Sequence, residues 1–479
     1  MTRRTYPVIG GFAASDAAKA RAWGIVATFP PPALLQTMTT RTRNLPAANR
    51  LQGRDIRTLT LSALGGALEF YDFVVFVFFA IPLGQLFFPP ATAPWLAQLQ
   101  VFGIFAAGYL ARPLGGIVMA HYGDTLGRKR MFMLSVFLMA LPTLAIGLLP
   151  VYAQIGMLAP LLLLLLRVLQ GIAVGGEVPG AWVFVAEHVP AERIGIACAS
   201  LTSGLTVGIL IGSVVAAAIN RSLTPAEILD YGWRLPFLAG GVFGFVAVWL
   251  RRWLSETPVF EAMNARRELA SGFPLAQVFR SHRPAVLLSM LVTWMLTAAI
   301  VVMILMTPSL VQSVFHIEAR RAFLGNNLAS FALALGCLFY GWLADSITSA
   351  RALLFGAIGL LLCSYALYFD LQAGAQHFVM LYTLTGFSVG VVGVVPSIMV
   401  TAFPPAVRFS GLSFSYNIAY ALFGGLTPPL IGILMQRAGP LAPAHYVAFT
   451  AVIGMLAALG LIARQHRDAS SARAQKSSS

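Results

Sequence analysis

Of the 479 residues in the chain, 58% are hydrophobic and only 10% are charged. A soluble globular domain has about 25% charged residues, so the composition excludes a soluble enzyme or binding module and indicates an integral membrane protein. A formal net charge of +15 would suggest nucleic acid as a partner of a soluble chain, but in a membrane protein the position of the basic residues matters more than their sum.

The chain begins with a basic, polar stretch, residues 1–57, which contains the run Pro30–Pro32 and no apolar core of the length of a secretory signal. We expect a disordered cytoplasmic tail. Met38 offers a second start, which leaves open whether residues 1–37 belong to the mature protein.

Twelve apolar runs follow, each about 20 residues long, which is the length an α-helix needs to cross about 30 Å of hydrocarbon. The sequence therefore predicts an all-α membrane protein with twelve transmembrane helices. The runs cover residues 58–82, 97–121, 130–149, 161–186, 195–219, 233–250, 284–308, 322–343, 351–369, 378–402, 410–435 and 444–463.

Most of the 32 Lys and Arg residues fall in the tails and loops on the side of the N-terminus. Because basic loops stay in the cytoplasm, we expect both termini there and a multi-pass protein of the cytoplasmic (inner) membrane. The three cysteines lie in apolar runs without metal or redox spacing.

The chain divides into two halves at its longest inter-helix loop. We expect a six-helix bundle over residues 58–250, a cytoplasmic linker over 251–283, a second six-helix bundle over 284–463 and a short cytoplasmic tail over 464–479. Corresponding loops carry corresponding residues: Asp124 after the second run matches Asp345 after the eighth, and Arg193 matches Arg408. This repetition predicts two parallel repeats with a substrate path between them.

Ionisable residues inside the first bundle are the main functional signal. A charged side chain at the centre of a bilayer costs about 3 kcal/mol or more, so such residues mark pathways or ion pairs. At a rise of 1.5 Å per residue, Glu69, Arg112 and Glu177 lie in one layer about 15 Å from the cytoplasmic face, with Asp72 one turn further out near Arg167. Three carboxylates face two guanidiniums, so one acid is left to exchange a proton, unless all five form a static ion-pair cluster.

Several motifs resemble the major facilitator superfamily, above all Asp124–Lys129 after the second run and Arg167–Gly171 in the fourth. Further segments resemble its metabolite:proton symporter family, whose members carry organic acids such as citrate, or zwitterions such as proline and betaine. They are Leu68–Phe73, Arg112–Gly116, Gly175–Glu177, Glu187–His188, Gly232–Phe237, Glu256–Phe260 and Phe403–Pro404 with Arg408 and Gly411. Thr125 and Ile194 depart from the pattern, because each stands where the family often has Arg.

The resemblance to sugar:proton symporters of the same superfamily implies that Asp72 carries the proton, with Arg167 as its partner and Glu69 beside them. Arg112 and Glu177 are expected to support this network or face the substrate, and Gln170 lies in the matching fourth-run motif. Apart from Arg351 at the start of the ninth run, the second half has no charge within its six runs. Its candidate substrate-binding residues are Trp294, Tyr416, Asn417 and Tyr420.

Charged residues near the cytoplasmic ends of both halves predict a gate, because pairing them would close the inward exit. A solvated cluster is the alternative, since exposed ion pairs contribute only about 0–1 kcal/mol. The residues are Asp124, Arg128, Glu187, Arg193, Glu256, Asp345, Arg351 and Arg408.

Together these features predict a monomeric secondary transporter, not an enzyme, that imports a small organic acid with protons by alternating access. The alternative is a proton symporter of a zwitterion such as proline or betaine; an exporter and a membrane receptor are weaker candidates. We expect no cofactor, no metal, because no two histidines share ligand spacing, and no nucleic acid among the partners. The tail after Arg464 has no heptads, which argues against the coiled coil of osmosensing betaine carriers.

Overall fold

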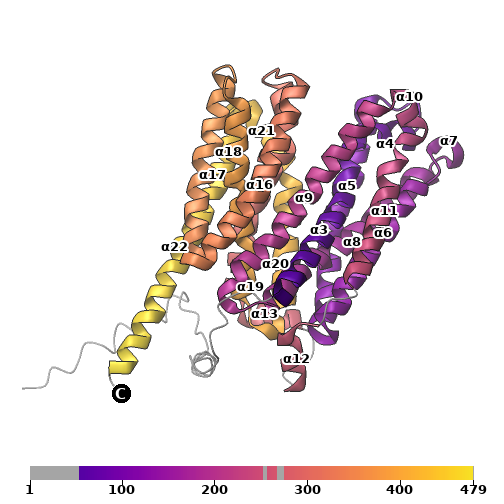
Figure 1. Cartoon of the computed structure of the whole chain (residues 1–479). Helices are drawn as coiled ribbons and strands as arrows, with labels where there is room; N and C mark the ends of the chain where they lie inside the picture. The colour runs from indigo at the N-terminus through magenta and orange to yellow at the C-terminus, as the bar shows by residue number, and fades with distance from the viewer. Residues whose placement is uncertain (1–52, 252–255, 267–273, 478–479) are drawn as a thin grey trace, which may run out of the picture. The chain divides into compact units, whose positions relative to one another are not determined.

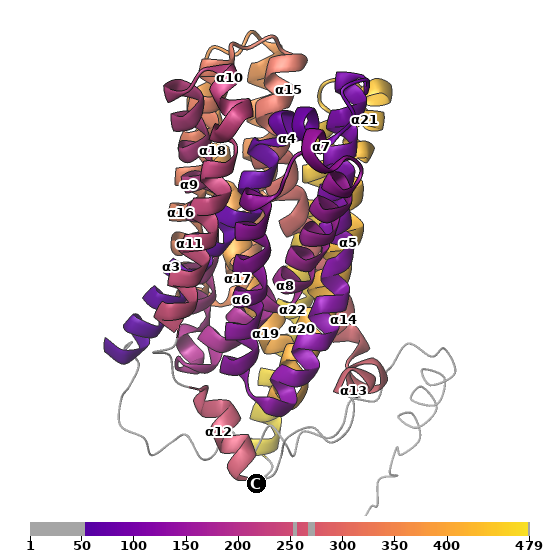
Figure 2. The same ribbon diagram turned by 90° about the vertical axis from the view of Figure 1, so that its right-hand side faces the viewer.

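The computed structural model describes residues 53–251, 256–266 and 274–477, and every regular element in these ranges is helical. The expected tail over residues 1–57 lies almost entirely outside the described residues. Figures 1 and 2 show two groups of long helices, one from each half of the chain. The fold is therefore the predicted one, an all-α protein of two six-helix bundles.

The first bundle begins with a span that is broken at Phe79 and continues through five long helices. The broken span consists of α3 (Gly53–Phe78) and α4 (Ala80–Phe87). The other long helices are α5 (Pro94–Leu126), α6 (Arg128–Leu148), α8 (Leu158–Glu187), α9 (Ile194–Ser222) and α11 (Arg234–Arg251). Short turns connect them: α7 (Tyr152–Ile155), η2 (Ala191–Arg193), α10 (Pro225–Glu227) and η3 (Ile228–Gly232).

The second bundle repeats this order with more interruptions. Its seventh span runs through α14 (Arg283–Ala298), the π-helical η4 (Ala299–Met306) and α15 (Thr307–Ser313). The eighth and ninth are α16 (Ala319–Ile347) and α17 (Ser349–Gln372), and the tenth joins α18 (Phe378–Val389), η5 (Gly390–Gly393) and α19 (Val395–Ala402). After η6 (Pro405–Val407), the eleventh joins α20 (Arg408–Ala419), the π-helical η7 (Tyr420–Gly424) and α21 (Gly425–Ala438), and the last is α22 (Ala442–Ser477).

Within the described residues, ten helices are long and apolar enough to cross a membrane, and twelve if each of two bent pairs counts as one span. Large apolar side chains lie on the outside of the bundles, where lipid would cover them; Leu110 is 67% exposed and Leu456 is 63% exposed. The number of spans agrees with the twelve apolar runs.

Two features differ from the boundaries expected from the sequence. The last helix does not end near residue 463 but continues as α22 to Ser477. The linker contains two short helices, α12 (Pro258–Ala265) and α13 (Pro274–Ser281). Thr257 caps α12, because its hydroxyl oxygen accepts a hydrogen bond from the Phe260 amide at 3.2 Å.

Helices α5 and α8 pack through glycines. A Cβ atom at Gly115 would overlap the carbonyl oxygen of Ile172, and one at Gly175 would overlap that of Arg112. Small residues let helix backbones approach this closely, and van der Waals contact then holds them together in lipid. This packing fixes the relative height of Arg112 on α5 and Arg167 on α8.

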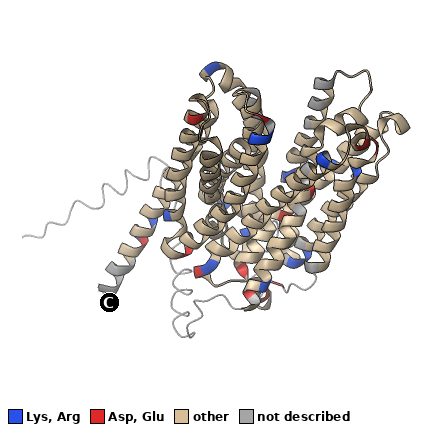
Figure 3. Ribbon diagram, turned by 45° about the horizontal axis from the view of Figure 1, so that its top comes forward, with Lys and Arg blue, Asp and Glu red and all other residues tan. Residues whose placement is uncertain are grey.

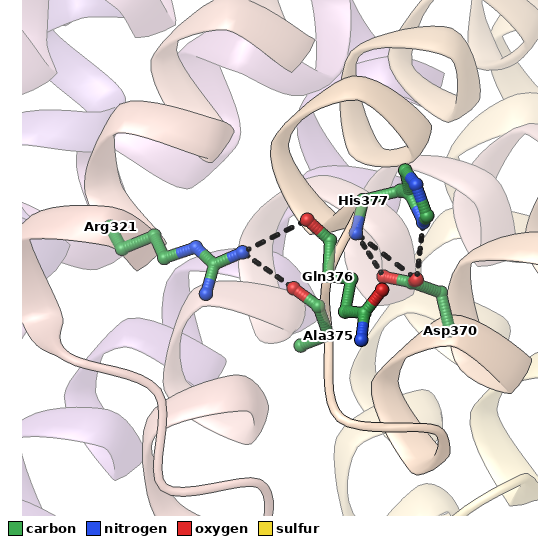
Figure 4. A network of polar contacts seen from close by, with 5 residues as sticks. All are labelled: Arg321, Asp370, Ala375, Gln376 and His377. Carbon is green, nitrogen blue, oxygen red and sulfur yellow. Dashed lines mark hydrogen bonds and ion pairs between the residues drawn. The ribbon is translucent and has the colours of Figure 1, made fainter.

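The α17–α18 turn is joined to the start of α16 and to the end of α17 by hydrogen bonds between side chains and backbone groups (Figure 4). The Arg321 guanidinium on α16 donates to the carbonyl oxygens of Ala375 and Gln376 in the α17–α18 turn. In the same turn, the His377 amide donates to Asp370 Oδ1 at 3.1 Å. All of these contacts lie within the second bundle.

Candidate functional site

Charged residues are sparse along the helices and gather near their ends (Figure 3). At the end that the Lys and Arg distribution predicts to be cytoplasmic, several of them connect the two bundles. We call the inter-bundle contacts of Asp124, Asp345, Glu187 and Arg408 the inner latch.

The inner latch contains a repeated contact between a carboxylate and a helix N-terminus. Asp124, at the end of α5, accepts a hydrogen bond from the Ser410 amide at the start of α20, at 2.9 Å. Asp345, at the end of α16, accepts from the amides of Gly195 and Ile196 at the start of α9, at 2.7 and 3.2 Å. Free backbone N–H groups and the helix dipole make such an end favourable for a carboxylate. Each bundle thus contributes one carboxylate that binds the N-terminus of a helix in the other bundle.

One ion pair completes the inner latch. Arg408 Nη1 lies 3.1 Å from Glu187 Oε1, with the Glu187 side chain buried. The Thr257 hydroxyl donates to Glu187 Oε2 at 2.8 Å, which attaches the linker to the same carboxylate. Nearby, Glu256 accepts from the Lys129 amide at 3.2 Å. A buried, hydrogen-bonded pair is worth more than the exposed pairs that the sequence left possible.

Not every residue expected at the gate takes part in these contacts. The side chain of Arg128 lies outside the described part of the chain. Arg193 lies close enough to Asp345 to act on its charge. Arg351 is different: its side chain is exposed, and its backbone amide donates to Thr348 Oγ1 at 3.4 Å.

Deeper between the bundles, Arg112 is 2% exposed and lies among tyrosine rings. Its Cζ atom is 4.3 Å from the ring centroid of Tyr420, 5.3 Å from that of Tyr416 and 5.5 Å from that of Tyr109. These distances lie within the range of cation–π attraction, about 6 Å. We call these three side chains the tyrosine cage.

Asn417 connects this region to the first bundle. Its amide nitrogen donates to the carbonyl oxygen of Gly175 at 2.6 Å, and its oxygen accepts from Arg112 Nε at 3.4 Å. Ser413, one turn earlier on α20, donates to the carbonyl oxygen of Gly116 at 3.0 Å. The structure therefore brings Arg112, Tyr416, Asn417 and Tyr420 together at the interface between the bundles.

Asp72 lies elsewhere, in the interior of the first bundle, and is 0% exposed. It faces α11, where a Cβ atom at Gly240 would overlap its Oδ1. Neither carboxylate oxygen has a hydrogen bond of good geometry among the described residues, and its polar neighbour is Thr143 on α6. The Thr143 hydroxyl itself donates to the Met139 carbonyl oxygen at 2.9 Å.

Hydrogen bonds through Gln170 and Thr143 connect Arg167 to the region of Asp72. Its Nη1 donates to Gln170 Oε1 at 2.9 Å, and Gln170 Nε2 donates to Thr143 Oγ1 at 2.7 Å. The guanidinium also lies over Phe76 and Phe105, with Cζ 4.6 and 4.8 Å from the ring centroids. Gln170 and Thr143 therefore stand between the Arg167 guanidinium and the Asp72 carboxylate.

Aromatic rings join the two buried guanidiniums. Phe105, which lies under Arg167, contacts Tyr109 edge to face at a centroid distance of 5.0 Å. Tyr109 in turn lies under Arg112. A chain of side chains in contact therefore runs from one guanidinium to the other.

Of three other predicted residues, the structure describes two side chains. The side chain of Glu69 lies outside the described part of the chain. Glu177 is 3% exposed, in the buried half of α8. Trp294 lies within the second bundle, stacked on Phe423 at 4.3 Å, and its indole donates to the Tyr446 hydroxyl at 2.9 Å.

Sequence patterns did not single out Tyr109 and Thr143. Tyr109 lies three residues before Arg112, so it shares a helix face with it, and this spacing was the available signal. Thr143 is one hydroxyl in a long apolar run, and nothing in its neighbourhood distinguishes it.

Two helical bundles with buried charges between and within them define a membrane transporter, and comparisons with known proteins give its family. The Major Facilitator Superfamily profile matches residues 62–408, and the chain belongs to this family. A Staphylococcus aureus (strain COL) protein, provisionally named a proline/betaine transporter, is 34% identical over 416 residues, covering 84% of this chain and 86% of the relative. The glycine betaine/proline/ectoine/pipecolic acid transporter OusA of Dickeya dadantii (strain 3937) is 31% identical over 422 residues, covering 85% and 83%.

Solved structures show the same fold. The proton:xylose symporter XylE superposes with a TM-score of 0.71 at 16% identity, covering 85% of this chain and 94% of XylE. The human organic anion transporter MFSD10 gives a TM-score of 0.62 at 16% identity, covering 85% and 100%. At this identity the likeness concerns the fold and says nothing of the substrate.

Proposed function

We propose that this protein takes up a small zwitterion, such as a betaine or proline, together with protons across the cytoplasmic membrane. The names of the relatives support this substrate class and give no support to the organic acids that the sequence first suggested. A zwitterion, which the sequence offered as the alternative substrate, is therefore preferred to an organic acid.

The observation that carries the proposal is the environment of Arg112. Its guanidinium is buried at the interface between the bundles, and among the described residues it makes no ion pair with a carboxylate. A buried charge is costly without a counterion. The carboxylate of a zwitterion would provide one, and guanidinium binds carboxylates in a bidentate manner.

Asp72 is our candidate for the proton carrier. It is fully buried in the first bundle and has no direct ion pair with another described residue, so protonation would remove a charge from an apolar surrounding. The bridge through Thr143 and Gln170 would make Arg167 sensitive to this change. Proton binding and the position of the buried cations would thus be coupled.

The inner latch is our candidate for the cytoplasmic gate. Its contacts join the bundles at one end, so they would hold the inward exit closed. Opening it would require breaking charge-assisted hydrogen bonds, each worth about 1.5–3 kcal/mol. In this scheme the protein acts as a monomer, with both termini on the cytoplasmic side, as the positive-inside rule predicts.

Uptake into proteoliposomes tests the substrate and the coupling together. We expect labelled glycine betaine or proline to accumulate when the outside is more acidic than the inside, and to equilibrate without accumulation when the pH gradient is collapsed. Citrate and 2-oxoglutarate, offered at the same concentration, should neither enter nor compete. Uptake of these acids without uptake of either zwitterion would reinstate the organic-acid hypothesis.

A further inference from the structure

The tyrosine cage surrounds a cation that has no carboxylate partner among the residues that the structure describes. Arg112 is 2% exposed, its Nη2 makes no hydrogen bond of good geometry, and its Nε donates to the neutral Asn417. The hydroxyl groups of Tyr416 and Tyr420 lie beside the same guanidinium. The rings therefore supply much of what stabilises this buried charge.

The geometry of the three rings suits a rounded cation. Tyr109 and Tyr420 are stacked nearly parallel, with centroids 5.7 Å apart and planes at 9°, and come from opposite bundles. Tyr416 is tilted by 52° to Tyr420 at a centroid distance of 5.2 Å. Trp182 packs edge to face on Tyr416 at 5.0 Å and fixes the orientation of its ring. Several ring faces are thus presented to one small volume.

The backbone at the cage is also irregular. Tyr420 is the first residue of η7, a π-helical segment that interrupts the eleventh span directly after α20. Single π-helical turns inside longer helices are frequent at functional sites, because they change which side chains face a ligand. Tyr416, four residues earlier in α20, shares a helix face with Tyr420, and both rings contact the same guanidinium.

We propose that the tyrosine cage binds the quaternary ammonium group of a betaine, and that Arg112, which covers these rings in this conformation, moves to the betaine carboxylate. This inference rests on the proposed function and specifies its substrate and site. The betaine ammonium then replaces the Arg112 guanidinium on the rings, so a cation covers the ring faces both before and after binding. The guanidinium, which has no acid partner among the described residues, gains one.

This arrangement favours a fully methylated ammonium over proline. A trimethylammonium group has no N–H donor, so aromatic faces are the groups that recognise it best. The secondary ammonium of proline needs hydrogen-bond acceptors, and among the described residues the polar neighbours of the Arg112 guanidinium are the hydroxyls of Tyr416 and Tyr420 and the amide of Asn417, all neutral groups. We therefore expect glycine betaine to bind more tightly than proline.

Variants of Tyr420 separate the ring from its hydroxyl. In proteoliposomes, Tyr420→Phe should keep the KM for glycine betaine within about twofold, and Tyr420→Leu should raise it about tenfold, the effect of losing one desolvated cation–π contact. Tyr365→Leu is the matched control, because Tyr365 pairs with His445 within the second bundle, away from the cage. Equal KM values for the Phe and Leu variants would overturn the proposal.

An uncharged isostere tests charge against shape. 3,3-Dimethylbutanoate has the carboxylate and outline of glycine betaine but carries carbon in place of the ammonium nitrogen. We expect it to inhibit glycine betaine uptake at least about tenfold more weakly than unlabelled glycine betaine does. Inhibition of equal strength would mean that the site recognises only the shape and the carboxylate of the ligand, and would overturn the proposal.

Removing the guanidinium tests the exchange of cations. In purified Arg112→Gln protein, glycine betaine should bind about tenfold or more weakly, whereas choline, which has the ammonium group but no carboxylate, should bind more tightly than in the parent. Thermal stabilisation by each compound measures both changes. A parallel loss of both ligands would contradict the exchange, and the Tyr420 variants still test the cage if this variant does not fold.

Failure of this inference differs from failure of the proposed function. A parent protein that transports neither glycine betaine nor proline contradicts the proposed function. A parent protein that transports them while Tyr420→Leu leaves the betaine KM unchanged contradicts the cage alone.

Discussion

Asp124 and Asp345 hold the same position in the two halves of the chain, and each accepts hydrogen bonds from the first amides of a helix in the opposite half. The two contacts are related by the internal repeat, since α5 corresponds to α16 and α20 to α9. An opening motion that separates the bundles at this end must break both. The inner latch therefore has two equivalent halves.

The first prediction concerns this pair. Asp345→Asn removes the charge that faces the N-terminus of α9, so the inner end should open more often. A cysteine placed at Ser413, which lies between the bundles against Gly116, reports the opening through its reaction with a membrane-impermeant maleimide in inside-out vesicles. We expect labelling about tenfold faster, the effect of weakening hydrogen bonds to a charged acceptor by about 1.4 kcal/mol.

Asp370→Asn is the matched control for that experiment. Asp370 also accepts from a backbone amide, that of His377, but both residues belong to one bundle. Its labelling rate should equal that of the parent. If Asp345→Asn and Asp370→Asn label at the same rate, the carboxylate of Asp345 does not hold the inner end closed.

The second prediction concerns the ion pair of the latch. Glu187→Gln and Arg408→Gln should each speed labelling of the Ser413 cysteine, because each removes one partner of a mostly buried contact at 3.1 Å. The double variant should be no faster than the faster single variant, since the second change has no pair left to break. Additive effects would show that the two residues act independently. Glu227→Gln, on the exposed turn at the other end, serves as the control.

The third prediction uses a difference between the repeats. Gly127, between α5 and α6, has φ of 118°, and Thr348, between α16 and α17, has φ of 132°. Such values strain a residue with a side chain by about 1–3 kcal/mol. Glycine costs about 0.5–1 kcal/mol more in chain entropy. Thr348→Gly should therefore stabilise the protein by about 1 kcal/mol, visible as a higher melting temperature in detergent.

The reciprocal variant checks the reasoning. Gly127→Ala should lower the melting temperature, because it adds strain at the same backbone conformation and its Cβ atom would meet the Glu256 carboxylate at 2.5 Å. Gly432→Ala, at a helical site with open space around it, should leave the melting temperature unchanged or raise it slightly. A lower melting temperature for Thr348→Gly would refute the strain argument.

The spans and the fold were predictable from the sequence because their cause is local: about 20 apolar residues suffice to cross the hydrocarbon layer. The repeated loops likewise placed Asp124 and Asp345 in matching positions. The sequence did not show in which direction around its helix axis each side chain points. Counting residues along a helix gives the height of Asp72 and Arg167, but not that Gln170 and Thr143 stand between them.

For a related reason, the sequence predicted only two of the three residues of the tyrosine cage. Tyr416 and Tyr420 were candidates because residues four apart share a helix face. Their partner Tyr109 comes from the other bundle, more than 300 residues earlier, and the π-helical start at Tyr420 has no evident sequence signal. For Arg351 the loop position matched the repeat, but a position along the chain could not show that its side chain is exposed.

The last prediction concerns proton coupling. Asp72→Asn keeps the size of a side chain that fits against Gly240, Gly244 and Thr143, but an amide cannot take up a proton in this pH range. Accumulation of labelled substrate against its gradient should be lost, whereas exchange across the membrane should stay within about twofold of the parent. Uptake by the parent should rise as the external pH falls, and the variant should show no such dependence. Asp230→Asn, on an exposed turn, should behave like the parent in both assays. Accumulation that persists in Asp72→Asn would place the proton on another group, because a side chain with no titratable site cannot carry it.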